Sequence, residues 1–407
     1  MLRAIYQSPA LRAAVGFGFG GVTFTVGNLI FARVLSSYQY GVLSLIIGVL
    51  AVTALCAPMG LDYAISRRGL ALGPSLRRAA LVTSTLIGVM AALISAALYH
   101  LDIILLLAIV VATVGMGTSQ SVAAYFQGQR QFALALPFTQ MSSWVLLLIG
   151  CMAWLCGITT ATLPAALIAL AAVLTAAAGW VMATMRSGDS DPQPTSLGLW
   201  NEAISLMTIN VAGAVLLQLE RLVIPMTIGV EDVALFGVAA SLVGSPFRML
   251  YSAVHFTVIP RLRAAQTVAE RRRLLGRELL LFGIIMGPTS LALWLLAPPK
   301  AHWFLGGKYD LSAAIMLAMI ISGLLKLLSA FGTAVVSALA PDRGLWLLST
   351  SSWVCIAVAI CCAFLFRRWG VCGAIYAVSV GWLGRTCVGF WISARQLRAQ
   401  PVLSLSK

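Results

Sequence analysis

Apolar runs of about twenty residues recur from one end of the chain to the other, separated by short polar segments. A helix of that length crosses the roughly 30 Å hydrocarbon core of a bilayer. We expect spans at residues 13–35, 40–64, 79–99, 103–126, 132–156, 162–184, 200–228, 233–260, 274–297, 311–339, 344–366 and 371–394. Alternating strands of about ten residues are absent, and lipid offers no partner for unpaired backbone groups. The pattern therefore predicts an all-α, polytopic membrane protein of about twelve transmembrane helices.

Composition agrees with this pattern, since 60% of the 407 residues are apolar and only 10% are charged. A water-soluble chain of this length could not cover its surface with so few charges. The first apolar segment follows Arg3 and Arg12 and lacks a convincing cleavage site. We therefore interpret it as a retained helix and not as a signal peptide.

Basic residues are distributed unevenly between the two sides of the predicted helices. With the N-terminus inside, inner segments hold eighteen of the 27 Lys and Arg residues, whereas outer segments hold Arg33, Lys300, Lys308, Arg367 and Arg368. This asymmetry follows the positive-inside rule and predicts that both termini are cytoplasmic. It also explains the net charge of +15 through topology and anionic headgroups, without a nucleic-acid partner.

One polar interruption, Arg186 to Leu199, divides the predicted spans six and six. A weak repeat accompanies the division, because Tyr40-Gly41 and Phe236-Gly237 open corresponding helices that end at Arg67 and Arg261. Two parallel six-helix repeats would produce this pattern and place a substrate path between them. We expect lobes at residues 1–185 and 200–407, joined by a cytoplasmic linker at 186–199.

The chain carries no recognisable catalytic or metal motif. Gly16, Gly18 and Gly21 spell G-x-G-x-x-G inside the first span, where close helix packing is favoured over dinucleotide binding. Walker A, H-E-x-x-H and G-x-S-x-G sequences are absent, and the eight cysteines fall in predicted spans without metal-finger spacing. The longest outer loop is expected from Ala297 to Asp310. We predict a transporter or scaffold with no metal and no cofactor, and not an enzyme.

Four cations fall inside predicted spans: Arg221, Arg248, Lys326 and Arg385. Each costs roughly 2.5 to 3.5 kcal/mol at a bilayer centre on insertion scales. The acids in or near the membrane are Glu220 and Asp62. The interior excess is therefore cationic, and guanidinium groups suit bidentate contact with phosphate or carboxylate. This balance favours a cavity for an anionic ligand.

Other interpretations remain open for these charges. Arg248 could form an internal ion pair, and Arg221 could extend its charge toward the outer interface. Glu220 points about 100° away from Arg221 on a helix, so it could neutralise Arg248 or take up a coupling proton.

Common structural roles can also explain three further residues. Asp62 and Arg33 lie near opposite interfaces, where headgroup contacts are the default. His255 is either a packing histidine or a proton relay.

Several segments resemble a known family. They are Asn28 to Gly41, Met59 to Asp62 with Arg67-Arg68, Tyr125 to Arg130, Gln218 to Arg221, and Phe236-Gly237 through Pro260-Arg261-Leu262. Together with the helix count and order, they resemble the O-antigen and exopolysaccharide (Wzx-like) flippases of the MOP superfamily, relatives of the lipid II flippase and the MATE exporters. The resemblance covers essentially the whole chain.

The resemblance implies a V-shaped, two-lobed transporter in the bacterial inner membrane. It would move an undecaprenyl-diphosphate-linked oligosaccharide from the cytoplasmic to the periplasmic leaflet by alternating access, coupled to an H⁺ or Na⁺ gradient. By position, Arg221 and Arg248 are the best candidates for the anion site, Lys326 is a third, and Arg385 and Arg33 complete the set. Glu220, Asp62 and His255 are candidates for ion coupling. A polysaccharide polymerase and a chain-length regulator are possible partners, beside membrane lipids.

Two other classes of protein stay open. A MATE-like exporter of cationic drugs would share the helix count, but it would need carboxylates in its cavity. A membrane-bound polysaccharide polymerase, ligase or glycosyltransferase would usually carry a large outer loop or an acidic catalytic cluster. The sequence shows neither a large outer loop nor an acidic catalytic cluster.

Overall fold

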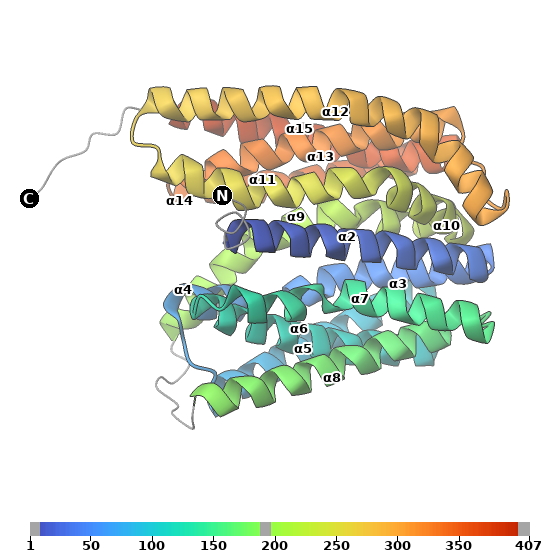
Figure 1. The fold of residues 1–407 in the computed structure, drawn as a ribbon, viewed down its shortest axis with the longest axis horizontal. Helices are drawn as coiled ribbons and strands as arrows, with labels where there is room; N and C mark the ends of the chain where they lie inside the picture. The colour runs from blue at the N-terminus through green and yellow to red at the C-terminus, as the bar shows by residue number, and fades with distance from the viewer. Residues whose placement is uncertain (1–8, 188–196, 398–407) are drawn as a thin grey trace, which may run out of the picture. The chain divides into compact units, whose positions relative to one another are not determined.

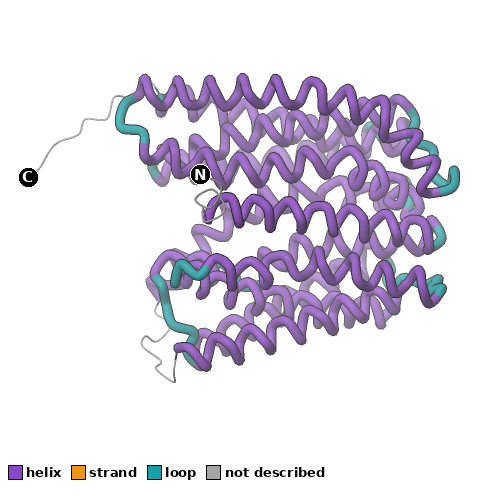
Figure 2. Tube along the Cα trace, in the orientation of Figure 1, coloured by secondary structure: helices purple, strands orange, loops and turns teal. Residues whose placement is uncertain are grey.

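The computed structural model describes residues 9–187 and 197–397, so most of the predicted linker at 186–199 and both chain ends lie outside it. Every regular element in the described ranges is helical, and none of them is a strand (Figure 2). The all-α prediction is confirmed.

In chain order the elements are α2 (Pro9–Val34), α3 (Ser37–Cys56), α4 (Leu61–Arg68), α5 (Pro74–Tyr99), α6 (Ile103–Gly128), α7 (Phe132–Cys156), α8 (Thr162–Ser187), α9 (Leu197–Thr227), α10 (Val230–Ala239), a π-helical segment (Ala240–Gly244), α11 (Ser245–Ala264), α12 (Val268–Leu305), α13 (Ala313–Leu339), α14 (Asp342–Leu365), a 3₁₀ turn (Arg367–Trp369) and α15 (Gly370–Gln396), as Figure 1 shows. Ten of the described helices are long and apolar enough to cross a membrane. Helices α2, of 26 residues, and α9, of 31, coincide with the two remaining predicted spans. The chain is a multi-pass membrane protein.

The second predicted span, 40–64, is wrong as a single helix. Helix α3 ends at Cys56, and α4 begins only at Leu61. Pro58 supplies no backbone donor, and Met59 and Gly60 adopt φ angles of 46° and 81°. A Cβ atom at Gly60 would collide with the backbone of Ala203 on α9, so glycine is required there. The break places Asp62 outside the membrane-crossing helix.

The outer loop expected from Ala297 to Asp310 is also shorter than predicted. Helix α12 continues through Pro298 and Pro299 and ends at Leu305. Gly306 and Gly307, at φ 64° and 77°, then turn the chain. The segment Phe304–Tyr309, which we call the outer strap, therefore replaces most of the expected loop.

The chain divides into two compact units: Met1–Ser241 with Phe304–Tyr309, and Leu242–Trp303 with Asp310–Lys407. This division groups α9 and α10 with the N-terminal helices. The six-helix lobes at 1–185 and 200–407 stay a prediction.

Within the first unit, α6 packs against α4, α5, α7 and α8, while α3 packs against α9 and α10. Helix α2 lies on α7, where Cβ atoms at Gly16 and Gly20 would meet the side chains of Leu136 and Gln140. The expected packing role is therefore confirmed for Gly16, whereas a Cβ atom at Gly18 would meet no other described residue within 4 Å. Leu61, Ile65, Phe126 and Trp180 belong to the core that fixes α4 on α6.

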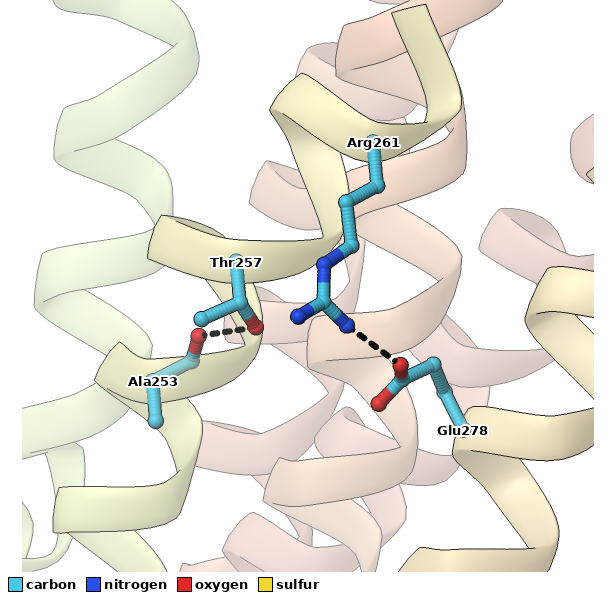
Figure 3. Close-up of polar contacts among 4 residues, drawn as sticks. All are labelled: Ala253, Thr257, Arg261 and Glu278. Atoms are coloured by element: carbon cyan, nitrogen blue, oxygen red, sulfur yellow. Dashed lines mark hydrogen bonds and ion pairs between the residues drawn. The ribbon is translucent and has the colours of Figure 1, made fainter. Parts of the chain in front are cut away.

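Within the second unit, α13 packs against α11 and α15 around a core that includes Val258, Phe331 and Val335. The Arg261 side chain, near the end of α11, reaches Glu278 on α12 with an Nη1–Oε1 distance of 2.8 Å (Figure 3). One turn earlier, Thr257 Oγ1 donates to the Ala253 carbonyl at 2.8 Å, which is a bond within α11. The α11–α12 corner thus combines an exposed ion pair with a buried apolar core.

Candidate functional site

Arg221 is buried in the first unit on α9, with 2% of its surface exposed, and the adjacent Glu220 is 1% exposed. The arginine stem can lie directly on α3 because Gly48 has no side chain there. A Cβ atom at Gly48 would stand 3.0 Å from Arg221 Cβ and 3.3 Å from its Cδ. The small residue thus lets a full guanidinium side chain enter a packed helix interface.

Aromatic side chains surround this guanidinium. Its Cζ atom lies 5.9 Å from the ring centroid of Phe24 on α2, within the range of a cation–π contact. Tyr40, on α3, is fully buried and interacts electrostatically with Arg221, as Glu220 does. Helix α10 packs next to Tyr40, because Gly237 lies against the Tyr40 hydroxyl and Ser44. We call Arg221, Tyr40 and Phe24 the arginine cluster.

The polar atoms of the arginine cluster are incompletely satisfied. Among the residues that the structure describes, Arg221 Nη1 and Nη2 make no hydrogen bond, and neither does the Tyr40 hydroxyl. A buried donor without an acceptor costs about 1–3 kcal/mol, and more when it is charged. A buried guanidinium that interacts electrostatically with a buried phenol is suited to an anionic oxygen.

A second buried arginine, Arg385, lies on α15 in the second unit and is 3% exposed. Its guanidinium is 5.6 Å from the ring centroid of Trp382 and interacts electrostatically with Tyr251 on α11. Within the described ranges, its Nε and Nη1 atoms have no hydrogen-bond acceptor. Arg385 is thus, like Arg221, a buried arginine with unsatisfied nitrogens, but it lies in the second unit.

The remaining predicted cations are less enclosed. Arg248, two residues after Pro246 on α11, and Lys326 on α13 are half-buried, and each has an interaction with the surrounding protein. Arg33 is exposed and stacks on Trp154 and Phe304 at 5.6 and 5.5 Å. The interfacial position expected for Arg33 stays a prediction.

The predicted site residues fall into two groups. Arg33, Asp62, Glu220 and Arg221 belong to the first unit, and Arg248, Lys326 and Arg385 belong to the second. The side chain of His255 lies outside the described residues. A shared anion site formed by all the cations therefore stays a prediction.

Asp62 occupies a polar groove that the sequence did not reveal. An open cavity of about 300 Å³ lies between α4 and α6, and Gln120 and Gln127 line it together with Asp62. Burial raises the pKa of the Asp62 carboxyl to about 6. One feature of the sequence could have predicted this groove. Two glutamines lie seven residues apart in an apolar span, a spacing that places them on one helix face.

Residues 30–314 match the model of a family described as polysaccharide biosynthesis protein. The chain belongs to this family. Membership confirms the resemblance to polysaccharide flippases of the MOP superfamily noted from the sequence. No curated protein matches the chain in sequence.

Solved structures of MOP transporters share the fold. An inward-facing multidrug-resistance MATE family transporter matches with a TM-score of 0.67 at 13% identity, over 93% of this chain and 94% of its own. The lipid II flippase MurJ, in an inward closed conformation, matches at 0.66 and 13%, over 94% and 87%. A MOP superfamily transporter from Pyrococcus furiosus matches at 0.57 and 13%, over 96% of both chains. At these identities the comparison establishes the fold of this polysaccharide biosynthesis family member and not its substrate.

Proposed function

We propose that this protein flips an undecaprenyl-diphosphate-linked oligosaccharide from the cytoplasmic to the periplasmic leaflet, by alternating access past a cationic site. The observation that carries the proposal is Arg221, a buried guanidinium with two nitrogens that have no hydrogen-bond acceptor in the described part of the chain. A diphosphate offers the oxygens that such a group lacks.

The sign of the interior charge supports a flippase over an exporter of cations. Arg221 and Arg385 are both more than nine-tenths buried, whereas Glu220 is the one fully buried acid among the described residues. A cationic drug would meet repulsion at both arginines. One structural neighbour, the transporter from Pyrococcus furiosus, is described by its reverse polarity of binding pocket, which suggests a different function. A change of polarity within the shared fold is therefore a precedent for a different cargo.

The remaining parts of the proposal follow from the family and from charge distribution. The protein is placed in a bacterial inner membrane with both termini cytoplasmic, because basic residues are concentrated in the predicted inner segments. Transport is coupled to an H⁺ or Na⁺ gradient, for which Glu220 and Asp62 are the described candidates. No cofactor and no catalytic step are assigned, and a polymerase and a chain-length regulator act on the product after translocation.

The test is leaflet-resolved labelling of lipid-linked oligosaccharide in cells depleted of this protein. Cells would be complemented at matched expression with wild type, Arg221→Met or Arg367→Met. The last variant loses the same charge from an exposed position on the 3₁₀ turn. We expect cytoplasmic-leaflet accumulation that wild type and Arg367→Met relieve and Arg221→Met does not.

Two other outcomes would contradict the proposal. Normal translocation with unpolymerised units gathering on the periplasmic side would indicate a polymerase or ligase. Full rescue by Arg221→Met would remove the arginine cluster from the transport path.

A further inference from the structure

The groove between α4 and α6 differs in chemistry from the rest of this apolar protein. Six of its seven lining residues are polar, and they are Asp62, Tyr63, Ser66, Arg67, Gln120 and Gln127. Polar groups that line one cavity can orient a ligand through hydrogen bonds, so the groove is a candidate binding surface.

The walls of the groove are held in place by helix geometry and by the core beneath them. Asp62 and Ser66 are four residues apart on α4, so they share one face, and Gln120 and Gln127 share one face of α6. The neighbouring face of α4 is fixed, since Leu61 and Ile65 pack into the core that contains Phe126. The groove is thus preformed, with no loop needed to complete it.

The lining groups combine donors and acceptors in a way that selects among ligand classes. A carboxylate only accepts hydrogen bonds, a guanidinium only donates, and amides and hydroxyls do both. A phosphate would need an excess of donors without a carboxylate, and a metal ion would need more acidic or histidine ligands than Asp62. Among the described residues no group of three or more potential metal ligands exists. Sugar hydroxyls, which each donate and accept, match the mixed set.

Asp62 supplies the acceptor that such a ligand would use. Its Oδ1 atom is enclosed and receives no hydrogen bond from any residue that the structure describes. A ligand hydroxyl would give it a charge-assisted hydrogen bond, roughly twice as strong as a neutral one. Gln127, in contrast, is exposed at the mouth of the groove and can meet an entering ligand first.

Size limits the ligand to part of a glycan. The cavity of about 300 Å³ is at the lower end of the range for small-molecule pockets. It is therefore suited to one sugar unit or a short segment. Arg67 and Arg68 close α4 at this end of the first unit, which the positive-inside rule assigns to the cytoplasm.

We propose that the α4–α6 groove is a glycan subsite, in which Asp62, Gln120 and Gln127 bind the hydroxyl groups of a sugar unit while the diphosphate is recognised elsewhere. This inference rests on the proposed flippase function and names the part of the substrate that the groove recognises.

The experiment measures equilibrium binding to the full chain in lipid nanodiscs. Two probes are compared: lipid-linked oligosaccharide extracted from the depleted host, and bare undecaprenyl diphosphate. The variants are Gln127→Leu and Asp62→Asn. Gln129→Leu, an exposed glutamine two residues past Gln127, and Asp102→Asn, the residue before α6 at its other end, are the matched controls.

We expect wild type and both controls to bind the glycan-bearing lipid at least five-fold more tightly than the bare lipid. Gln127→Leu and Asp62→Asn should lose most of that preference and keep their affinity for the bare lipid. Equal binding of both probes by wild type overturns the subsite and leaves the flippase proposal standing. Preference retained in both groove variants, or parallel loss of affinity for both probes, also overturns it. Binding of neither probe by wild type overturns both proposals.

Discussion

A buried charge such as Arg221 can serve either the stability of the fold or the recognition of a ligand. If Arg221 served the fold, replacing it with an apolar residue of similar length would destabilise the protein. Its Nη1 and Nη2 atoms have no acceptor among the described residues, however, so Arg221→Met removes buried charged donors whose unsatisfied state costs about 1–3 kcal/mol or more. We expect Arg221→Met to abolish transport while its Tm in detergent stays equal to or above that of wild type.

The measurement pairs thermal unfolding with the leaflet assay on the same preparations. Gly48→Leu is the structural comparison, because a side chain there would collide with the Arg221 stem. That variant should lose both stability and transport. A Tm several degrees below wild type for Arg221→Met would show that the arginine holds α3 and α9 together.

Asp62 predicts a pH dependence of stability whose sign can be worked out. Burial raises the pKa of its carboxyl from 3.8 to about 6, so the folded protein binds the proton more tightly than the unfolded chain. Stability therefore falls as pH rises from about 4 to about 6 and changes little from this group above that range. Asp62→Asn should flatten this part of the Tm profile between pH 4 and 7. A profile that is unchanged in the variant would contradict the assignment.

At the scale of elements, the π-helical segment Ala240–Gly244 interrupts what the sequence predicts as one span, 233–260. Pro246, the second residue of α11, lacks the N–H that a regular helix would use. The boundary between the two compact units, Ser241 to Leu242, lies inside this segment. We predict that the chain bends at this segment during transport.

Pro246→Ala tests this interpretation. The alanine restores a backbone donor and favours a regular helix, so we expect equal or higher thermal stability and a several-fold loss of transport rate. Pro288→Ala, inside α12, is the matched control and should leave the rate unchanged. A normal rate in Pro246→Ala would show that the π-helical segment is a static feature.

Sequence reasoning succeeded for the helices and failed where tertiary packing decides. Twenty-residue apolar runs fix helix positions because lipid leaves no alternative. The break at Pro58 to Gly60 was visible in residue types, yet hydropathy carried the predicted span through it. The closeness of Arg221 to Gly48, and of Asp62 to Gln120, depends on which faces of distant helices meet, and a single sequence does not state that.

At the scale of the whole molecule, the outer strap Phe304–Tyr309 connects distant parts of the chain. It belongs to the first unit, while the residues on both sides of it belong to the second. Lys308 Nζ donates to the Ala32 carbonyl at 3.0 Å and to the Leu35 carbonyl, both at the end of α2. Tyr309 meets the Tyr40 ring edge-on, with centroids 6.4 Å apart. The strap therefore reaches the arginine cluster through Tyr40.

These contacts satisfy carbonyl groups that the last turn of α2 leaves without partners, and the lysine charge complements the negative end of the helix dipole. The two units are covalently linked at 241–242, 303–304 and 309–310, so a rearrangement of one unit relative to the other acts on both ends of the strap. The strap must then release α2 or move with it. Lys308→Met should weaken this attachment by about 1 kcal/mol, since one charged donor is lost.

Hydrogen exchange gives the measurement. In Lys308→Met we expect faster exchange of amides in residues 32–40 and no change in α13, with Lys300→Met as the control for loss of a nearby charge. Arg221 should also become more accessible from the outer side, which cysteine labelling at position 221 would detect as faster modification in the Lys308→Met background. Unchanged exchange and labelling would contradict this role of Lys308 and would show that the aromatic contacts of Tyr309 and Phe304 hold the strap.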